Sequence, residues 1–274
     1  MPHQTCSTDP ALAAIPVHQW RDGTITARTD VVATEVPVAL EYNGISHAVM
    51  LATPQDLEDF ALGFSLSEGI LHSAADLFDC ELVERTDGIA VQMRIAGDCF
   101  AAMKDRRRNM TGRTGCGLCG AETLQQAIRR PAPVTSTPYF TAAALRSGIA
   151  SMQHQQRLQQ ASGATHAAAW LAADGKVSMV REDVGRHNAL DKLIGALART
   201  RQELAGGAVL ITSRASYEMV QKTAVLGAGM LVAISAPTSL AVALAQSANL
   251  TLVGFMRDHS HVVYSLPERL ANRS

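Results

Sequence analysis

Short apolar runs alternate with amphipathic stretches through the second half of the chain. The runs are rich in alanine or β-branched residues and predict strands, and the stretches between them carry apolar residues at helical spacing. Strands are predicted at 166–171, 177–180, 208–212, 230–234, 251–255 and 261–265, and helices at about 140–160, 187–199, 216–226 and 238–248. This alternation is typical of an α/β layer on a largely parallel sheet. It predicts an α/β domain over residues 139–270.

The first half has the pattern of a strand-rich α+β domain. Its β-branched runs between residues 24 and 49 are broken by the turn dipeptide Asn43-Gly44, which is typical of a hairpin. Thr53-Pro54 is expected to open a helix, with proline in the first turn. Further strands are predicted at 79–84 and 89–95.

Three boundaries follow from these patterns. Residues 1–23 lack periodicity and are expected to form a flexible terminus. The smaller domain then spans residues 24–130. The segment 130–138 contains three prolines and is predicted to link the two domains.

Composition and charge narrow the possible partners. Hydrophobic residues make up 47% of the 274 residues and charged residues 18%, which excludes a disordered chain. The formal net charge of −1 provides no cationic field for nucleic acid or an anionic membrane. We therefore expect neither as a partner.

The uncharged stretch 223–256 is long enough to cross a membrane. Pro237 lies in its middle among polar residues, so a buried strand–helix–strand unit explains it better. The N-terminus lacks a signal-peptide pattern, and an odd count of five cysteines does not suggest a disulfide framework. These features predict a cytoplasmic protein.

Two cysteines stand in a glycine-rich, basic segment. Cys116 and Cys119 lie within the motif Gly115–Gly120, inside a predicted exposed loop at 104–123 that carries five cations. Flanking glycines leave sulfur accessible, and positive potential favours the reactive thiolate. One alternative is a zinc site in which Cys80 and Cys99 supply the other two ligands, but this is awkward because both lie in strand-like sequence. The other alternative is that the two cysteines have no function.

A second polar motif occupies residues 182–192, where a strand passes into a helix. Asp183 is placed to cap that helix. His187 and Asp191 lie four residues apart, so the carboxylate could orient the imidazole. The other interpretation is a satisfied polar network that holds the strand–helix turn.

Three later strands also end in polar turns. In an open parallel sheet these turns gather at one edge, where ligands bind against helix N-termini. Arg186, Arg214 and Arg257 would then converge on an anion, most simply a phosphate or pyrophosphate. Capped helix starts are the simpler explanation of any single turn. No metal site is predicted.

These motifs, in this order, resemble the formate dehydrogenase accessory sulfurtransferase family of the FdhD type. The resemblance covers about residues 30–266. It rests on the segments 53–69, 115–120, 182–192, 213–222, 236–241 and 251–257.

The resemblance implies a sulfurtransferase. A cysteine desulfurase would hand sulfur to Cys116 as a persulfide, with Cys119 assisting or protecting. The sulfur would pass to a molybdenum bis(molybdopterin guanine dinucleotide) cofactor before that cofactor enters formate dehydrogenase. GDP or GMP could mimic the cofactor.

The resemblance also implies a cofactor site, a fold and a homodimer. The nucleotide segment of the family falls on Phe255, Met256, Arg257, Asp258, His259 and Ser260, with Arg186, His187 and Arg214 at the same edge. The larger domain would be a three-layer α/β/α sheet resembling cytidine deaminases. Family members often carry a second basic residue where this chain has 258–261.

Two other functions remain open at this stage. One is a dithiol oxidoreductase that cycles Cys116 and Cys119 between thiol and disulfide. The other is a zinc-binding chaperone for the molybdenum cofactor, without persulfide chemistry.

Overall fold

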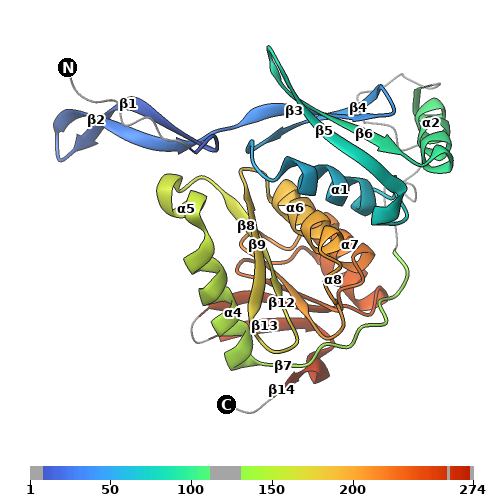
Figure 1. Cartoon of the computed structure of the whole chain (residues 1–274). Helices are drawn as coiled ribbons and strands as arrows, with labels where there is room; N and C mark the ends of the chain where they lie inside the picture. Colours follow the sequence, from blue (N-terminus) through green and yellow to red (C-terminus); the bar gives the residue numbers. More distant parts are fainter. Residues whose placement is uncertain (1–8, 112–130, 258–259, 272–274) are drawn as a thin grey trace.

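The computed structural model describes residues 9–111, 131–257 and 260–271, which form a larger and a smaller domain (Figure 1). The larger domain contains a six-stranded sheet covered by helices. The smaller domain contains a four-stranded sheet and lies against one end of the larger one. The predicted α/β class with a strand-rich N-terminal part is confirmed.

The larger sheet has the strand order β13-β12-β11-β10-β8-β9. Its strands are β8 (His166–Leu171), β9 (Val177–Asp183), β10 (Ala208–Ile211), β11 (Met230–Ala233), β12 (Thr251–Arg257) and β13 (Ser260–Ser265). Only β10, β11 and β12 are parallel neighbours, and the other pairings are antiparallel. The prediction of a largely parallel sheet is therefore wrong. The connections between β8 and β9 and between β12 and β13 are too short for crossover helices, so these pairs are hairpins.

Helices cover both faces of this sheet and give the expected three layers. One face carries α6 (Arg186–Arg199), α7 (Tyr217–Val225) and α8 (Ser239–Ser247), and the other carries α4 (Ala142–Gln155) and α5 (Arg157–Ser162). Successive side chains of a strand point to opposite faces. Accordingly, Trp170 packs in the core under α6 and α7, and Leu171 packs in the core under α4.

The smaller sheet has the order β4-β3-β6-β5 and packs on α1. Its elements are β3 (Val36–Tyr42), β4 (Ile45–Ala52), α1 (Leu57–Ser67), η1 (Ala74–Asp76), β5 (Leu77–Arg85), β6 (Gly88–Ile95) and α2 (Gly97–Thr111). The predicted Asn43-Gly44 turn is confirmed, with φ values of 46° and 82°. Tyr42 and Phe60 are fully buried between the sheet and α1.

The first described residues form a hairpin arm rather than a loose terminus. Strands β1 (Leu12–Arg21) and β2 (Thr24–Ala33) pair along their whole length and project from the body (Figure 1). The turn Asp22-Gly23 has positive φ at both residues, as a two-residue hairpin requires. Most arm side chains are exposed, so the sequence lacks the alternation that marks a half-buried strand.

Two further local predictions are corrected. Helix α1 begins at Leu57, after an Asp56 in the left-handed conformation, so Thr53-Pro54 precedes the helix. Helix α2 continues to Thr111, so the predicted loop at 104–123 is helical over its first eight residues. The remaining residues of that loop lie outside the described residues.

The predicted linker is packed onto the larger domain although it contains no regular element. Val134 is buried, and its backbone N–H donates to Ala248 O at 2.9 Å. Asn249 Nδ2 donates to Val134 O at 2.7 Å. The short strands β7 (Phe140–Thr141) and β14 (Leu270–Ala271) pair beyond it, next to η2 (Pro267–Arg269).

Helices α1 and α6 join the two domains through a close crossing. A Cβ atom on Gly63 would overlap the carbonyl group of Asp191, and one on Gly195 would overlap the carbonyl group of Asp59. Only glycine permits this approach of two helix backbones. The two positions therefore set the distance between the domains.

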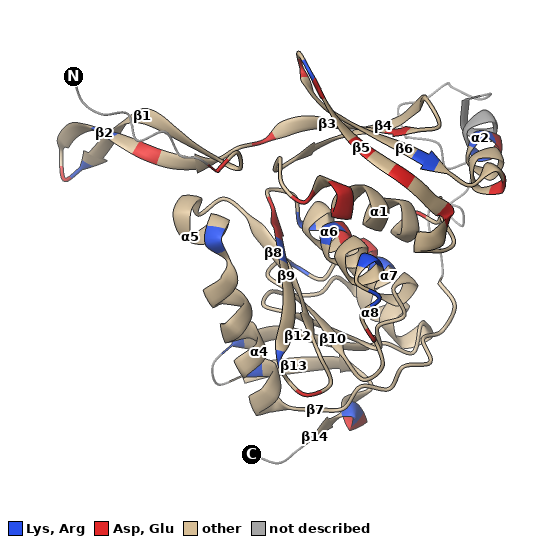
Figure 2. Cartoon of the chain, viewed as in Figure 1, with Lys and Arg blue, Asp and Glu red and all other residues tan. Residues whose placement is uncertain are grey.

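The acidic first turn of α1 adds ion pairs to this crossing (Figure 2). Asp59 is fully buried and lies 2.7 Å from both Arg181 Nη2 and Arg199 Nη2. Glu58 lies 2.7 Å from Arg199 Nη1. A carboxylate buried at a domain boundary is stabilised when two guanidinium groups pair with it.

Gly63→Ala is expected to lower the free energy of unfolding by about 3 kcal/mol, because the added methyl group meets backbone that cannot move aside. Gly97→Ala is the matched control, since nothing lies within 4 Å of its Cβ position. Chemical denaturation of both variants measures the difference. Equal stability would show that the helix crossing is not tight.

Candidate functional site

The carboxyl edge of the larger sheet brings together the polar turns that the sequence predicted. Strand β9 runs in the same direction as β10, β11 and β12, because two antiparallel pairings separate it from β10. Backbone hydrogen bonds join neighbouring turns: Ala215 N donates to Ala236 O at 3.2 Å, and Phe255 N donates to Ser235 O at 3.2 Å. These turns form one continuous edge.

The three arginines stand in a row along this edge. Arg186 begins α6 after β9, Arg214 follows β10 and Arg257 ends β12. Two strand positions separate each neighbouring pair, or roughly 10 Å at the usual strand spacing. All three arginines therefore stand at the predicted edge, spread along it rather than gathered at one strand end.

The segment at the end of β12 has an unusual backbone. The ladder with β13 is irregular between Gly254 and Arg257, and Phe255 has a φ of 51°, which is rare for a bulky residue. Phe255 is consequently exposed, whereas Met256 is buried in the core under α4. Ser260 pairs with Arg257, and Asp258 and His259 lie outside the described residues.

Two pairs of polar side chains join the facing helices α6 and α7. His187 Nε2 lies 2.6 Å from Glu218 Oε2, and Lys222 Nζ donates to Asp191 Oδ1 at 2.9 Å. The predicted pairing of His187 with Asp191 is therefore wrong. His187 pairs with Glu218 and Asp191 pairs with Lys222, so each residue has its partner on the neighbouring helix. Burial lowers the pKa of His187, and Glu218 opposes this shift.

Lys222 also connects these side-chain pairs to the smaller domain. Its Nζ also donates to Ser67 Oγ at 2.8 Å and to Glu68 Oε1 at 3.2 Å. Burial disfavours the charged form of Lys222. The nearby carboxylates of Asp191 and Glu68 outweigh this effect and raise the pKa of Lys222. Asp191 and Lys222 thus form a buried ion pair with further hydrogen bonds at the domain boundary.

The remaining acidic residues of the 182–192 motif hold the strand–helix turn. Asp183 is fully buried 2.7 Å from Lys192 Nζ and accepts a hydrogen bond from Thr53 N in the smaller domain at 3.0 Å. It also accepts from the N–H of Gly185, the residue that precedes α6, so it does not itself cap the helix. Glu182 accepts from Leu158 N at the start of α5. This part of the motif is the satisfied polar network considered as the simpler interpretation.

The cysteines divide into two groups. Cys6, Cys116 and Cys119 lie outside the described residues. Cys99 is buried in the core of the smaller domain, and burial raises the pKa of its thiol. Burial, helped by Glu58 and Asp79, raises the pKa of Cys80 to about 11. Both of these cysteines are neutral thiols at neutral pH.

Among the described residues, no group of three or more His, Cys, Asp and Glu side chains gathers in a way that could hold a metal ion. None of the helices in 9–111, 131–257 and 260–271 is both long and apolar enough to cross a membrane.

Three features of this region could not be predicted from the sequence. Lys222 was not expected as the partner of Asp191, because the pairing joins separate helices. The bulge at Phe255 carries no local sequence mark such as glycine. The glutamines of α4 and α5 lie beside the same edge, and the hydrophobic pattern showed them only as polar helix positions.

The three-layer domain with a small appended sheet has a counterpart among solved structures. A crystal structure solved as a candidate formate dehydrogenase accessory protein from Desulfotalea psychrophila superposes with a TM-score of 0.75. The match covers 96% of this chain and all of that one, at 24% sequence identity. This likeness shows the fold.

The sequence comparisons show the family. The FdhD/NarQ family matches residues 33–271, and the chain belongs to it. A relative named sulfur carrier protein FdhD from Cupriavidus necator is 60% identical over 265 residues, which cover 97% of this chain and 92% of the relative. A relative of the same name from Bordetella petrii is 54% identical over 268 residues, covering 97% and 96% respectively.

Lys222→Met is expected to lower the free energy of unfolding by about 3 to 5 kcal/mol, because it leaves Asp191 buried without its cation. The double variant Lys222→Met, Asp191→Leu should recover much of this loss. The exposed Lys176→Met is the control and should change stability little. Denaturant titration tests all three, and a small effect of Lys222→Met alone would contradict the buried pair.

Proposed function

We propose that this protein is a sulfur carrier that accepts sulfur as a persulfide on Cys116 and delivers it to the molybdenum of a bis(molybdopterin guanine dinucleotide) cofactor. The observation that carries the proposal is membership of the FdhD/NarQ family over residues 33–271, with relatives named as sulfur carriers. The sulfur donor would be a cysteine desulfurase, and the recipient a formate dehydrogenase. We place the reaction in the cytoplasm, with the protein as a homodimer.

The choice of cysteine follows from the chemistry of the thiols. Only a thiolate attacks a persulfide readily, and the raised pKa values of Cys80 and Cys99 keep both protonated. Cys116 stands between two glycines in a sequence rich in arginine, which favours an accessible thiolate. Cys119, three residues later, is assigned an assisting role.

The first step is a thiol exchange. The Cys116 thiolate would attack the terminal sulfur of the desulfurase persulfide, and the S–S bond of the donor would break. The desulfurase cysteine would leave as a thiolate, so sulfur moves without a change in overall oxidation state. The terminal sulfur would then bond to the molybdenum of the cofactor as the S–S bond of the Cys116 persulfide breaks and Cys116 leaves as a thiolate. The two electrons that turn this sulfur into sulfide would come from the molybdenum of the substrate, which would pass from Mo(IV) to Mo(VI).

The cofactor would lie along the carboxyl edge of the larger sheet. Arg186, Arg214 and Arg257 are spaced for phosphate groups along an extended dinucleotide, and the exposed Phe255 ring can stack on a purine. His187 is assigned to the same edge. The hydrogen bond from Thr53 N to Asp183 joins this edge to the smaller domain, whose helix α2 precedes the cysteine motif in the sequence.

Incubation with a cysteine desulfurase and cysteine should add the mass of one sulfur atom to the protein. Intact-mass spectrometry should detect the gain, and a reductant should remove it. Cys116→Ala should abolish the gain, and Cys80→Ala, which alters a protonated thiol, should retain it.

Two results would contradict this assignment. One is an equal mass gain in wild type and Cys116→Ala. The other is no gain in wild type together with about one zinc ion per chain, which would favour a metal-binding role for the cysteines.

Arg257→Ala is expected to weaken GDP binding by about tenfold, the typical effect of losing one charged hydrogen bond to phosphate. Arg85→Ala, at an exposed hairpin position of the smaller domain, is the matched control. Isothermal titration at low salt measures both affinities. Unchanged affinity of the Arg257 variant would remove this residue from the proposed cofactor site.

A further inference from the structure

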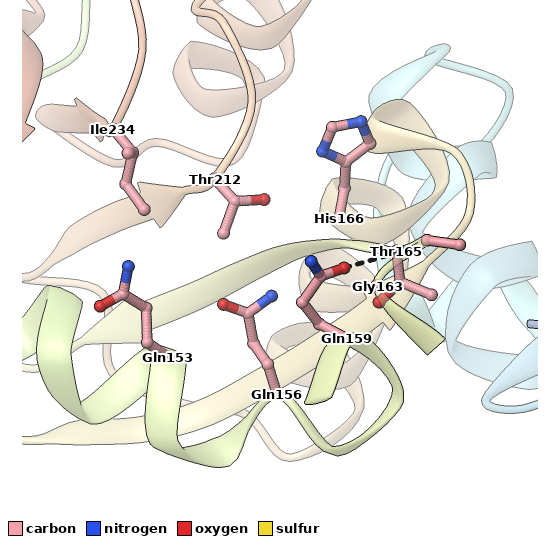
Figure 3. A pocket seen from close by; sticks show the side chains of 9 residues that line it. Gln153, Gln156, Gln159, Gly163, Thr165, His166, Thr212 and Ile234 are labelled. Atoms are coloured by element: carbon pink, nitrogen blue, oxygen red, sulfur yellow. Dashed lines mark hydrogen bonds between the residues drawn. The ribbon is translucent and has the colours of Figure 1, made fainter. Parts of the chain in front are cut away.

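Two histidines stand at the carboxyl edge of the larger sheet. His166 is the first residue of β8 and lines a pocket of about 640 Å³ beside the edge (Figure 3). His187 lies in the first turn of α6. Burial is the main cause that lowers the pKa of each imidazole. Both rings are therefore mainly neutral at neutral pH, and a neutral imidazole can accept a proton.

The two imidazoles differ in their carboxylate partners. His187 Nε2 lies 2.6 Å from Oε2 of Glu218, which belongs to the first turn of α7. The carboxylate that raises the pKa of His166 is Asp183, and Asp183 is already paired with Lys192. His187 and Glu218 thus form a carboxylate–imidazole dyad at the edge.

The contact with Glu218 decides which nitrogen of His187 can accept a proton. A ring nitrogen this close to a carboxylate carries the hydrogen, so the lone pair of the neutral ring is on Nδ1. The carboxylate holds the ring in this tautomer and stabilises the imidazolium ion that forms when Nδ1 takes up a proton. This is the arrangement of a general base with its orienting group.

A second pair of side chains supports the dyad. Asp191 and Lys222 follow His187 and Glu218 by four residues on the same two helices and pair at 2.9 Å. The inner pair is buried, whereas 28% of the His187 side chain and 57% of the Glu218 side chain are exposed. The inner pair therefore fixes the spacing of the two helices, and a ligand at the edge can reach the outer pair.

Three charged side chains act on His187. Glu218 raises the pKa of His187, and Arg186 and Lys222 lower it. The positive end of the α6 dipole acts in the same direction as the two cations. Removal of the Glu218 charge should consequently lower the pKa of His187 further.

We infer that His187 transfers the proton in the step that delivers sulfur to the cofactor, and that Glu218 is its positioning residue. The inference rests on the proposed function, because it concerns the reaction of the Cys116 persulfide with the molybdenum substrate at the carboxyl edge. It assigns to Nδ1 of His187 the proton that the terminal sulfur has to lose.

The step balances without a further reactant. The terminal sulfur of the protonated persulfide bonds to molybdenum, and the electron pair of the S–S bond passes to Cys116 Sγ. The molybdenum of the substrate supplies the two electrons that make the terminal sulfur a sulfide. The proton moves from that sulfur to His187 Nδ1 and then to Cys116 Sγ, which ends as a thiol. His187 returns to its neutral form.

The test is the rate of sulfur delivery in a single turnover at saturating cofactor, followed by intact mass across the pH range in which histidine titrates. Wild type should become faster as the pH rises through the pKa of His187, because only the neutral ring accepts a proton. His187→Gln should be about 100-fold slower and lose this pH dependence, since a general base typically contributes at least that factor. His166→Gln, the same substitution at the other edge histidine, should keep the pH dependence.

Glu218→Gln tests the positioning role. Glutamine keeps the size of the side chain and can accept the Nε2 hydrogen, but it lacks the charge. Delivery should slow by about tenfold, the effect of losing one charged hydrogen bond, and its pH dependence should move to lower pH. The titration of the His187 ring, measured by NMR, should move in the same direction. Glu203→Gln, at an exposed position beyond the C-terminal end of α6, should change neither readout.

Two results would overturn the inference while leaving the proposed function intact. One is delivery by His187→Gln at the wild-type rate. The other is a Glu218→Gln variant in which the NMR titration of His187 moves but the pH dependence of delivery does not. A wild type that carries a persulfide on Cys116 and delivers no sulfur at any pH contradicts the proposed function itself, and the inference with it.

Discussion

The close crossing of α1 and α6 is the contact on which the other features depend. Gly63 and Gly195 bring the two helix backbones together, and no other residue would fit at either position. The crossing fixes α6, and α6 carries Arg186 and His187 at the carboxyl edge and Asp191 at the domain boundary. The buried pairs Asp183–Lys192 and Asp191–Lys222 lie within the larger domain. Their hydrogen bonds to Thr53, Ser67 and Glu68 of the smaller domain hold the two domains together.

The charged residues that hold the fold are different from those that are accessible to a ligand. The acidic residues of the 182–192 motif are buried and matched by lysines or backbone N–H groups. The arginines of the edge are at least partly exposed. Long-range electrostatic attraction of a ligand by the whole molecule contributes little, since the net charge is only −1.

Much of the larger domain could be predicted from the sequence because its buried strands and amphipathic helices have strong, distinct periods. The direction of the strands was harder to predict. The five-residue connection with Gly175 between β8 and β9 indicates a hairpin, but alternation alone suggests parallel strands. The first strand of the hairpin arm was missed because its side chains are mostly exposed, although Asp22-Gly23 is a turn signal. Of the site, the edge and its arginines followed from topology. The partner of His187 did not, because Glu218 belongs to another helix and only tertiary packing brings it within 2.6 Å.

The central claim is that sulfur held on Cys116 passes to a cofactor bound at the carboxyl edge. A single-turnover experiment tests it most directly: the protein is loaded with persulfide, freed of desulfurase, and mixed with the molybdenum bis(molybdopterin guanine dinucleotide) cofactor. Intact mass is then followed over time for wild type and Arg257→Ala. Wild type should lose one sulfur atom on mixing, and the variant should retain it much longer at the same cofactor concentration. Equal rates of loss in the two proteins, or a persulfide that stays on wild type, would contradict it.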